Sequence, residues 1–232
     1  VEVIYGDKPA LDKINMSVKK GDIYALIGKN GAGKTTLLRL FTGQNAPDYG
    51  SIELFGKKGT RGLNEARKRT GAIIETPAFY PFFSAERNLE YYRIQRGIDD
   101  PSIVETVLKE TGLYEAKDKK FKNFSLGMKQ RLGIALSLMH DPEFLILDEH
   151  TAALDPKTAE IIMELTDKIV KEKKVTTIMV THNLRYAVEY GDRLIMMHQG
   201  NAIIDKAGEE KAKMKVDDIL ETFNRISIEC GN

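Results

Sequence analysis

The sequence contains a single cysteine, Cys230, among its 232 residues. One cysteine excludes an internal disulfide framework and is typical of a protein from a reducing compartment. Basic and acidic residues nearly cancel, at 35 and 34, so no basic excess favours nucleic acid as a partner. No apolar run approaches the roughly 20 residues that span a bilayer, and no signal-peptide pattern is present. We therefore expect a cytoplasmic location, with any membrane role depending on a partner.

The chain is long enough to bury one large core, or one core and a small subdomain. Apolar strand patterns alternate with amphipathic helices in 1–75 and 143–232, whereas 76–142 is patterned as helices joined by irregular turns. We predict an α/β core from the two outer ranges and a helical subdomain from the middle one. The strands expected early in the core are 1–5, 14–18, 23–27 and 51–55.

A glycine-rich stretch, Gly28-Lys29-Asn30-Gly31-Ala32-Gly33-Lys34-Thr35-Thr36, lies between an apolar run and a helical pattern. The spacing G-x-x-x-x-G-K-[ST] predicts a phosphate-binding loop (P-loop), whose backbone N–H groups converge on one hollow beside a positive helix end. We expect Lys34 to reach the β- and γ-phosphates of a nucleoside triphosphate and the Thr35 hydroxyl to bind Mg²⁺. The complete pattern in this context argues against a glycine-rich turn that binds nothing.

Two acidic residues, Asp148 and Glu149, end the apolar run 144–147. A buried strand that ends in this way places the acids at the carboxyl edge of the sheet, where α/β proteins bind ligands. We expect Asp148 to hold Mg²⁺, directly or through water, and Glu149 to polarise the attacking water. The alternative is an acid pair that lies at the surface without a role.

His182 follows the β-branched strand pattern 175–180, so it can reach a nucleotide held at the same edge of the sheet. Ser125 and Gly127 lie at the start of a helix that we expect from about 126 to 139. This helix end is a second candidate phosphate site, although Ser125 also suits a plain helix cap. A second anion-binding helix suggests that two chains share one nucleotide.

These motifs, with Leu154-Asp155, resemble in order and spacing those of the ATP-binding-cassette (ABC) transporter ATPases, and the resemblance covers essentially the whole chain. It implies a P-loop NTPase fold, with a RecA-like core, an antiparallel β region and the inserted helical subdomain. It further implies hydrolysis of ATP with Mg²⁺ in a homodimer that shares two ATP sites. The implied partner is a transmembrane permease at the inner face of the cell membrane.

The resemblance assigns roles to individual residues. Tyr5 matches the aromatic residue that stacks on adenine, although a half-exposed strand tyrosine explains it equally well. Asp155 matches the loop that communicates across the dimer. The remaining assignments are the phosphate loop (Gly28, Asn30, Gly31, Gly33, Lys34, Thr35, Thr36), the signature residues that bind the ATP of the opposite subunit (Ser125, Gly127), the magnesium aspartate (Asp148), the catalytic glutamate (Glu149) and the switch histidine (His182).

Three positions depart from the usual family pattern. Glu75 stands where the family has a nucleotide-site glutamine, and its carboxylate adds a negative charge beside the polyphosphate. The signature Leu-Ser-Gly-Gly-Gln is replaced by 124–128, Phe-Ser-Leu-Gly-Met, which retains the serine and the second glycine. His150 replaces a proline, and we assign it no catalytic role.

Glu75 and the signature resemble the ATPases of bacitracin- and lantibiotic-type peptide exporters, whereas 150–230 resembles an uncharacterised group of uptake ATPases associated with aromatic amino acids. A chimera joined near residue 149 and a single lineage with both features are equally open. The first part favours peptide-antibiotic export or resistance. The alternatives are amino-acid uptake, a recombinant cassette without a cognate transporter, and a non-transport cassette of repair or translation.

The transport partner is expected to dock on the helical subdomain and on the loop after Glu75. Residues 79–83, Phe-Tyr-Pro-Phe-Phe, form the aromatic cluster that is the best candidate for this contact. An equally open alternative is that these rings belong to the core of the subunit.

Overall fold

The computed structural model describes residues 1–74 and 78–229. At its centre is a six-stranded sheet with the strand order β4-β5-β6-β3-β7-β8. All neighbouring pairs are parallel except β7 and β8, which form an antiparallel hairpin. The strands are β3 (Ile23–Gly28), β4 (Thr70–Ile73), β5 (Phe144–Asp148), β6 (Thr176–Val180), β7 (Arg193–His198) and β8 (Asn201–Ala207).

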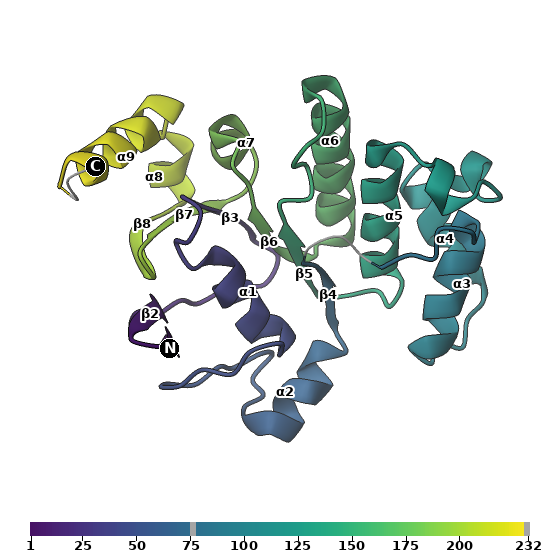
Figure 1. Ribbon diagram of the computed structural model, residues 1–232, viewed down its shortest axis with the longest axis horizontal. Coiled ribbons are helices and arrows are strands. Elements are labelled where there is room, and N and C mark those ends of the chain that lie inside the picture. Colours follow the sequence, from purple (N-terminus) through teal and green to yellow (C-terminus); the bar gives the residue numbers. More distant parts are fainter. Residues whose placement is uncertain (75–77, 230–232) are drawn as a thin grey trace.

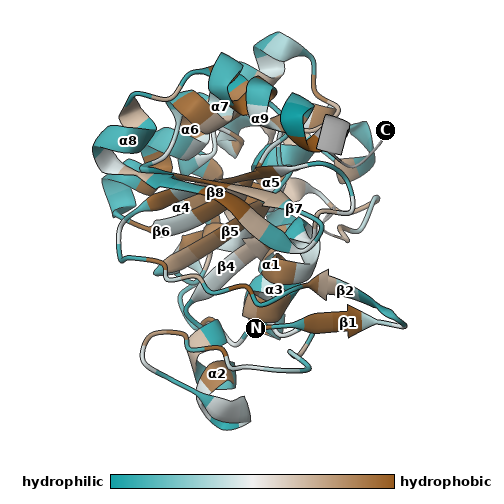
Figure 2. Ribbon diagram, turned by 90° about the vertical axis from the view of Figure 1, so that its left-hand side faces the viewer, coloured by the Kyte–Doolittle hydropathy of each residue, from teal (hydrophilic) through white to brown (hydrophobic). Residues whose placement is uncertain are grey.

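Strands β3, β5 and β6 are buried on both faces, as strands inside a parallel sheet are expected to be, whereas the edge strand β8 is largely exposed. Successive side chains of a strand point to opposite faces, so each of these three buried strands contributes to two cores. In β3, Ala25 and Ile27 belong to the larger core, and Tyr24 and Leu26 belong to the smaller one. Figure 2 shows the apolar residues gathered on the strands between two layers of helices.

The smaller core is closed by the P-loop helix α1 (Lys34–Thr42), by α2 (Gly59–Arg67) and by an antiparallel hairpin of β1 (Val3–Tyr5) and β2 (Lys8–Leu11). Helices α6 (Pro156–Lys173), α7 (Leu184–Glu189) and α9 (Val216–Glu229) cover the opposite face (Figure 1). The short helix α8 (Gly208–Ala212) joins β8 to α9. In the described part of the chain, no helix is both long enough and apolar enough to cross a membrane.

The middle of the chain is helical, with α3 (Ala85–Gln95), α4 (Ser102–Glu110), α5 (Leu126–Leu138) and two 3₁₀ turns, η1 (Tyr114–Ala116) and η2 (Phe121–Asn123). Ser84 caps α3 by accepting a hydrogen bond from the Arg87 N–H at 3.1 Å. These helices gather at one end of the molecule (Figure 1). Their apolar faces belong to the same larger core as the sheet, so the helical segment is packed onto the rest of the subunit.

Two expected strands, 14–18 and 51–55, do not form, and those two predictions were wrong. In 14–18 the Ile14 N–H donates to the Val1 carbonyl at 3.0 Å, whereas the Ser17 carbonyl accepts from the Tyr24 hydroxyl at 3.3 Å and from Arg193 Nη1 at 3.2 Å, so no continuous ladder forms. In 51–55 only Leu54 pairs, in an isolated bridge to Lys57. The antiparallel β region is instead the β1–β2 hairpin, of which only the first strand was predicted.

Candidate nucleotide-binding site

The carboxyl ends of three parallel strands meet at one edge of the sheet. Strand β6 lies between β3 and β5, and Val180 pairs with both Leu26 and Asp148. The P-loop after β3, the acid pair after β5 and His182 after β6 are therefore brought together, although they lie far apart in the sequence. This is the edge at which open α/β sheets bind ligands.

The P-loop requires glycine at two of its positions. Gly28 has φ +151° and Gly33 has φ +99°, which are backbone conformations that other residues rarely adopt. A Cβ atom at Gly28 would lie 2.4 Å from the Met197 carbonyl oxygen, and one at Gly33 would lie 2.5 Å from the Ala10 carbonyl oxygen. The close approach of the loop to β7 and β2 thus depends on the missing side chains.

A hollow of about 410 Å³ opens over this loop. Its lining contains eight of the residues predicted for the nucleotide site, namely Tyr5, Asn30, Gly31, Gly33, Lys34, Thr35, Thr36 and Glu149. Tyr5 is 53% exposed, and its hydroxyl accepts a hydrogen bond from Asn45. The aromatic face of Tyr5 is therefore available at the rim of the hollow.

Lys34 is buried at the start of α1, with 5% of its surface exposed. Its Nζ donates hydrogen bonds to the Gly28 carbonyl at 2.8 Å and to the Lys29 carbonyl at 3.2 Å. Burial lowers the pKa of Lys34, and the nearby charges of Glu149 and Asp148 oppose this shift. The loop thus holds an ammonium group within electrostatic range of Glu149 and Asp148.

The side chains of Thr35 and Asp148 form a pair of oxygen donors suited to Mg²⁺. The Thr35 hydroxyl donates to Asp148 Oδ2 at 3.0 Å, while Asp148 Oδ1 is buried without a hydrogen-bond partner in the described residues. Burial raises the pKa of Asp148, although the Thr35 hydrogen bond lowers it. A buried unpaired carboxylate oxygen is costly, and a cation would satisfy it.

No group of three or more His, Cys, Asp or Glu side chains in the described ranges could form a protein-only metal cage. Mg²⁺ does not require one, because it is commonly bound by one or two protein oxygens together with substrate phosphates and water. The hydroxyl and carboxylate present here therefore fit a nucleotide-bound Mg²⁺.

Glu149 and His182 contact each other at the same edge, with 2.6 Å between Oε1 and Nε2. Glu149 has φ +48°, a left-handed conformation that is uncommon outside glycine, and its N–H donates to the Val180 carbonyl at 3.1 Å. This turn directs the carboxylate from the end of β5 toward the P-loop hollow. Such local strain is typical of functional sites.

Ser125 and Gly127 are not part of this hollow in the same subunit. Ser125 caps α5 by accepting from the Met128 N–H at 3.3 Å. A Cβ atom at Gly127 would lie 2.6 Å from Thr158 Cγ2, so this glycine is also required for α5 to pack against α6. Asp155, whose side chain accepts from the Thr158 N–H at 3.0 Å, caps α6.

Two of the three positions that depart from the usual family pattern are Glu75 and His150. Glu75 lies outside the described residues. His150 is 2% exposed, with its Nε2 3.4 Å from the Thr166 hydroxyl, and it does not line the P-loop hollow. Burial lowers the pKa of His150 to about 4, so the ring is neutral near pH 7. The structure gives His150 a place in the core between β5 and α6.

Three contacts of the site were not predicted from the sequence. The packing of Gly127 on Thr158 and the bond from Asn45 to Tyr5 leave no signal in the sequence pattern. The cap of α6 could have been found, because Asp155 followed by proline is a typical helix start.

A P-loop before a helix, with strand-end acids and a histidine on the same sheet edge, defines a nucleotide-binding ATPase domain of the P-loop class. The ABC transporter family model matches residues 11–152. The chain belongs to this family, and the predicted fold class is confirmed.

Two relatives are similar over most of this chain. The bacitracin transport ATP-binding protein BcrA of Bacillus licheniformis is 39% identical over 200 residues, which is 86% of this chain and 65% of the relative. A tyrosine transport ATP-binding protein of Clostridioides difficile (strain R20291) is 35% identical, with 94% of this chain and 93% of that protein covered. The chain thus spans about two thirds of the length of BcrA and nearly all of the tyrosine-transport relative.

A dimeric ATP-binding cassette, MJ0796, in a post-hydrolysis state bound to ADP and Pi, superposes with a TM-score of 0.77. It is 26% identical and matches 89% of this chain and 94% of its own.

These matches confirm the resemblance to bacitracin transport ATPases and to an ATPase of aromatic amino-acid transport. The chimera stays a hypothesis without support, because both of these relatives align across the supposed join near residue 149.

Proposed function

We propose that the chain is the ATP-binding and ATP-hydrolysing subunit of an ABC membrane transporter, acting at the cytoplasmic face of the cell membrane. The observation that carries the proposal is the contact of Glu149 with His182 at 2.6 Å beside the Thr35–Asp148 pair. This arrangement places a candidate base, a candidate metal site and a phosphate loop at one sheet edge. The proposal agrees with the family and with both transport relatives.

In this mechanism Thr35 and Asp148 hold Mg²⁺, Lys34 binds the β- and γ-phosphates, and Tyr5 stacks on adenine. Mg²⁺ held by Thr35 and Asp148 would supply positive charge that offsets the charge on the phosphates. Glu149 accepts a hydrogen bond from the attacking water and aligns it with the γ-phosphate. His182 Nε2 donates to Glu149 and holds the carboxylate in place.

Substitution of Glu149 by glutamine tests this assignment. We expect the Glu149→Gln variant to bind ATP normally, to lose about a hundredfold or more in turnover, and to accumulate as an ATP-bound dimer, because an amide cannot align and polarise the water. Turnover measured with labelled ATP and mass measured by light scattering report both effects. The matched control is Glu172→Gln, on an exposed glutamate of α6. Wild-type turnover in Glu149→Gln would contradict the assignment.

We further propose that two copies share each ATP, with Ser125 and Gly127 of one copy facing the P-loop of the other. The position of α5 outside the P-loop hollow supports this sharing, because the two phosphate-binding helix ends do not meet within one subunit. The dimeric state of the MJ0796 cassette is in agreement.

The helical segment 76–142 is proposed to be the subdomain that contacts the permease. The aromatic cluster 79–83 divides between core and surface, since Phe79 is 7% exposed whereas Tyr80 is 42% and Phe82 is 71% exposed. Asn88 fixes this segment, accepting from the Tyr80 N–H at 2.8 Å and donating to its carbonyl at 3.1 Å. We therefore assign Tyr80 and Phe82 to the docking surface and Phe79 to the core.

The similarity to BcrA favours peptide-antibiotic export or resistance as the transport process. Amino-acid uptake is the alternative, supported by the similarity to the tyrosine transport protein. Co-purification with a permease from the native host, compared between the wild type and Phe82→Asp, distinguishes both from a cassette without a cognate transporter. A permease retained by the wild type and lost in Phe82→Asp is the expected result. No retained permease in either sample would favour the cassette without a transporter.

A further inference from the structure

His182 lies in the short connection 181–183 between the end of β6 and the start of α7. Thr181 is 3% exposed, and its hydroxyl accepts a hydrogen bond from the Asn183 N–H at 3.0 Å. Strand β6 is fixed inside the sheet, so the remaining freedom of the connection depends on α7. The distance between His182 and Glu149 is therefore sensitive to the placement of this helix.

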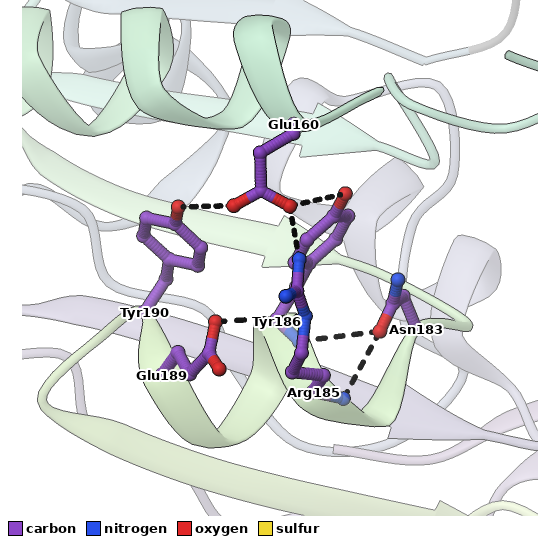
Figure 3. A network of polar contacts seen from close by, with 6 residues as sticks. All are labelled: Glu160, Asn183, Arg185, Tyr186, Glu189 and Tyr190. Carbon is purple, nitrogen blue, oxygen red and sulfur yellow. Dashed lines mark hydrogen bonds and ion pairs between the residues drawn. The ribbon is translucent and has the colours of Figure 1, made fainter. Parts of the chain in front are cut away.

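Helix α7 contains only six residues, Leu184–Glu189. The Asn183 side chain caps it by accepting from the N–H groups of Arg185 at 3.0 Å and Tyr186 at 3.3 Å (Figure 3). A helix of this length is not stable by itself, because few hydrogen bonds offset the cost of nucleation. Contacts with neighbouring elements must hold it in place.

Glu160 makes the polar contacts that hold α7 to α6. Its carboxylate accepts hydrogen bonds from the Arg185 guanidinium near the start of α7, from the Tyr186 hydroxyl at 3.4 Å and from the Tyr190 hydroxyl at 3.4 Å, just past the helix end (Figure 3). Ala159 and Ile162, beside Glu160 on α6, are buried in the larger core. Tyr186 and Ala187 bury one face of α7 in the larger core, and the carboxylate of Glu160 adds polar contacts near both ends of the helix.

Glu160 and two of its partners line a hollow that is also lined by Glu149 and His182. This hollow, of about 730 Å³, is lined by Glu149 and His182 and by Glu160, Arg185 and Tyr186. Burial raises the pKa of Tyr190 to about 12, and the charge of Glu160 adds to the shift, so this phenol remains a hydrogen-bond donor at neutral pH.

We propose that Glu160 and Arg185 are positioning residues for ATP hydrolysis, whose ion pair fixes α7 against α6 and so holds His182 in contact with Glu149. The inference rests on the proposed function and adds a pair of residues 25 positions apart to its machinery. Neither side chain contacts the P-loop or the candidate metal site.

The ion pair between Glu160 and Arg185 is expected to affect the position of His182 more than the stability of the fold. The side chains of Arg185 and Glu160 are 52% and 33% exposed, and pairs this exposed contribute little to the stability of a fold. A catalytic contact is more sensitive, because a displacement of about 1 Å can reduce a rate by about a hundredfold. Loss of the pair is therefore expected to reduce turnover while the protein stays folded.

The experiment compares steady-state ATP hydrolysis by the full chain in the wild type, Glu160→Gln and Arg185→Gln. The matched control is Glu189→Gln, which removes the other acidic partner of Arg185, at 3.7 Å on the same helix, and leaves α6 untouched. We expect kcat to fall about tenfold in both test variants. The KM for ATP and the Tm are expected to match those of Glu189→Gln, and the double variant is expected to be no slower than either single one.

Whether Glu160 and Arg185 act by positioning His182 is tested in a His182→Ala background. Single-turnover hydrolysis of labelled ATP is measured, because it resolves very slow rates. If the pair acts by positioning His182, adding Glu160→Gln there has an effect of less than about twofold, because coupled residues are not additive. An equal loss in both backgrounds, an unchanged kcat, or a lowered Tm with a raised KM would each overturn the proposal. Failure of the proposed function itself would appear separately, as normal turnover in Glu149→Gln.

Discussion

His140 joins three elements through one imidazole ring. Its Nε2 donates to the Thr70 carbonyl at 3.0 Å at the start of β4, and its Nδ1 lies 3.5 Å from Arg96 Nη1 just after α3. Burial lowers the pKa of His140, the charge of Arg96 lowers it further, and the Thr70 bond and Asp141 oppose the shift. The neutral ring, with its proton on Nε2, is the form that this site stabilises.

The depressed pKa of His140 predicts a loss of stability in mild acid. The unfolded chain takes up a proton near pH 6.5 and the folded chain only at lower pH, so the contribution is fully present above pH 6.5 and is lost as the pH falls below it. The test is the free energy of unfolding in urea at pH 8 and at pH 5.5, measured for the wild type and for His140→Gln, whose amide can still donate to Thr70. The variant should lose less stability in acid. An identical loss in both proteins would contradict this role for His140.

At the residue scale, the sequence predicted contiguous motifs well and pairwise contacts poorly. Lys34, Thr35, Asp148 and His182 could be placed because each lies at or after the end of a strand of the parallel sheet. The contact between Glu160 and Arg185 could not, because two polar residues on different helices carry no pattern that specifies their partner.

At the scale of elements, the packing of α5 on α6 depends on the absence of a side chain at Gly127. The Thr158 methyl group would lie 2.6 Å from a Cβ atom at that position. Thr158 is β-branched and lies in the first turn of α6, so its side chain has little freedom to move away. The same glycine belongs to the signature sequence. Both the packing of α5 on α6 and the proposed phosphate contact therefore restrict which residue can stand at position 127.

We predict that Gly127→Ala destabilises the subunit by about 1–2 kcal/mol, because overpacking costs about 1–3 kcal/mol and the better helix propensity of alanine returns up to about 1 kcal/mol. Thr158→Ser removes the obstructing methyl group, so the double variant should be at least as stable as Thr158→Ser alone. Urea unfolding without nucleotide measures both. Wild-type stability in Gly127→Ala would show that the helices can move apart without cost.

Element boundaries were predicted best where capping residues and apolar periodicity agree. Helix α5 begins at Leu126 as predicted, because Ser125 caps it. Helix α2 was missed because Gly59 and Gly62 lower its helix propensity, and tertiary contacts hold it, among them Arg67 bonded to the Phe41 carbonyl at 3.0 Å. The strand prediction over 14–18 failed because the Ser17 carbonyl bonds to side chains instead of to a neighbouring strand.

At the scale of the whole molecule, the two helix ends that we propose to bind phosphate, at the starts of α1 and α5, do not share a hollow within one subunit. The start of α1 lies at the carboxyl edge of the sheet, and the start of α5 lies on the far side of α6 (Figure 1). If each end contacts the same nucleotide, the contact joins two subunits. We therefore propose that the unit of hydrolysis is a dimer with shared sites.

Mixing two inactive variants tests this claim most directly. Lys34→Ala damages the P-loop side of each site, and Ser125→Arg damages the signature side, so either homodimer lacks an intact site. A mixed dimer places both lesions in one site and leaves the other intact, so equal mixing should restore up to about a quarter of wild-type ATP turnover. Turnover that stays at the sum of the two separate variants would contradict the shared site.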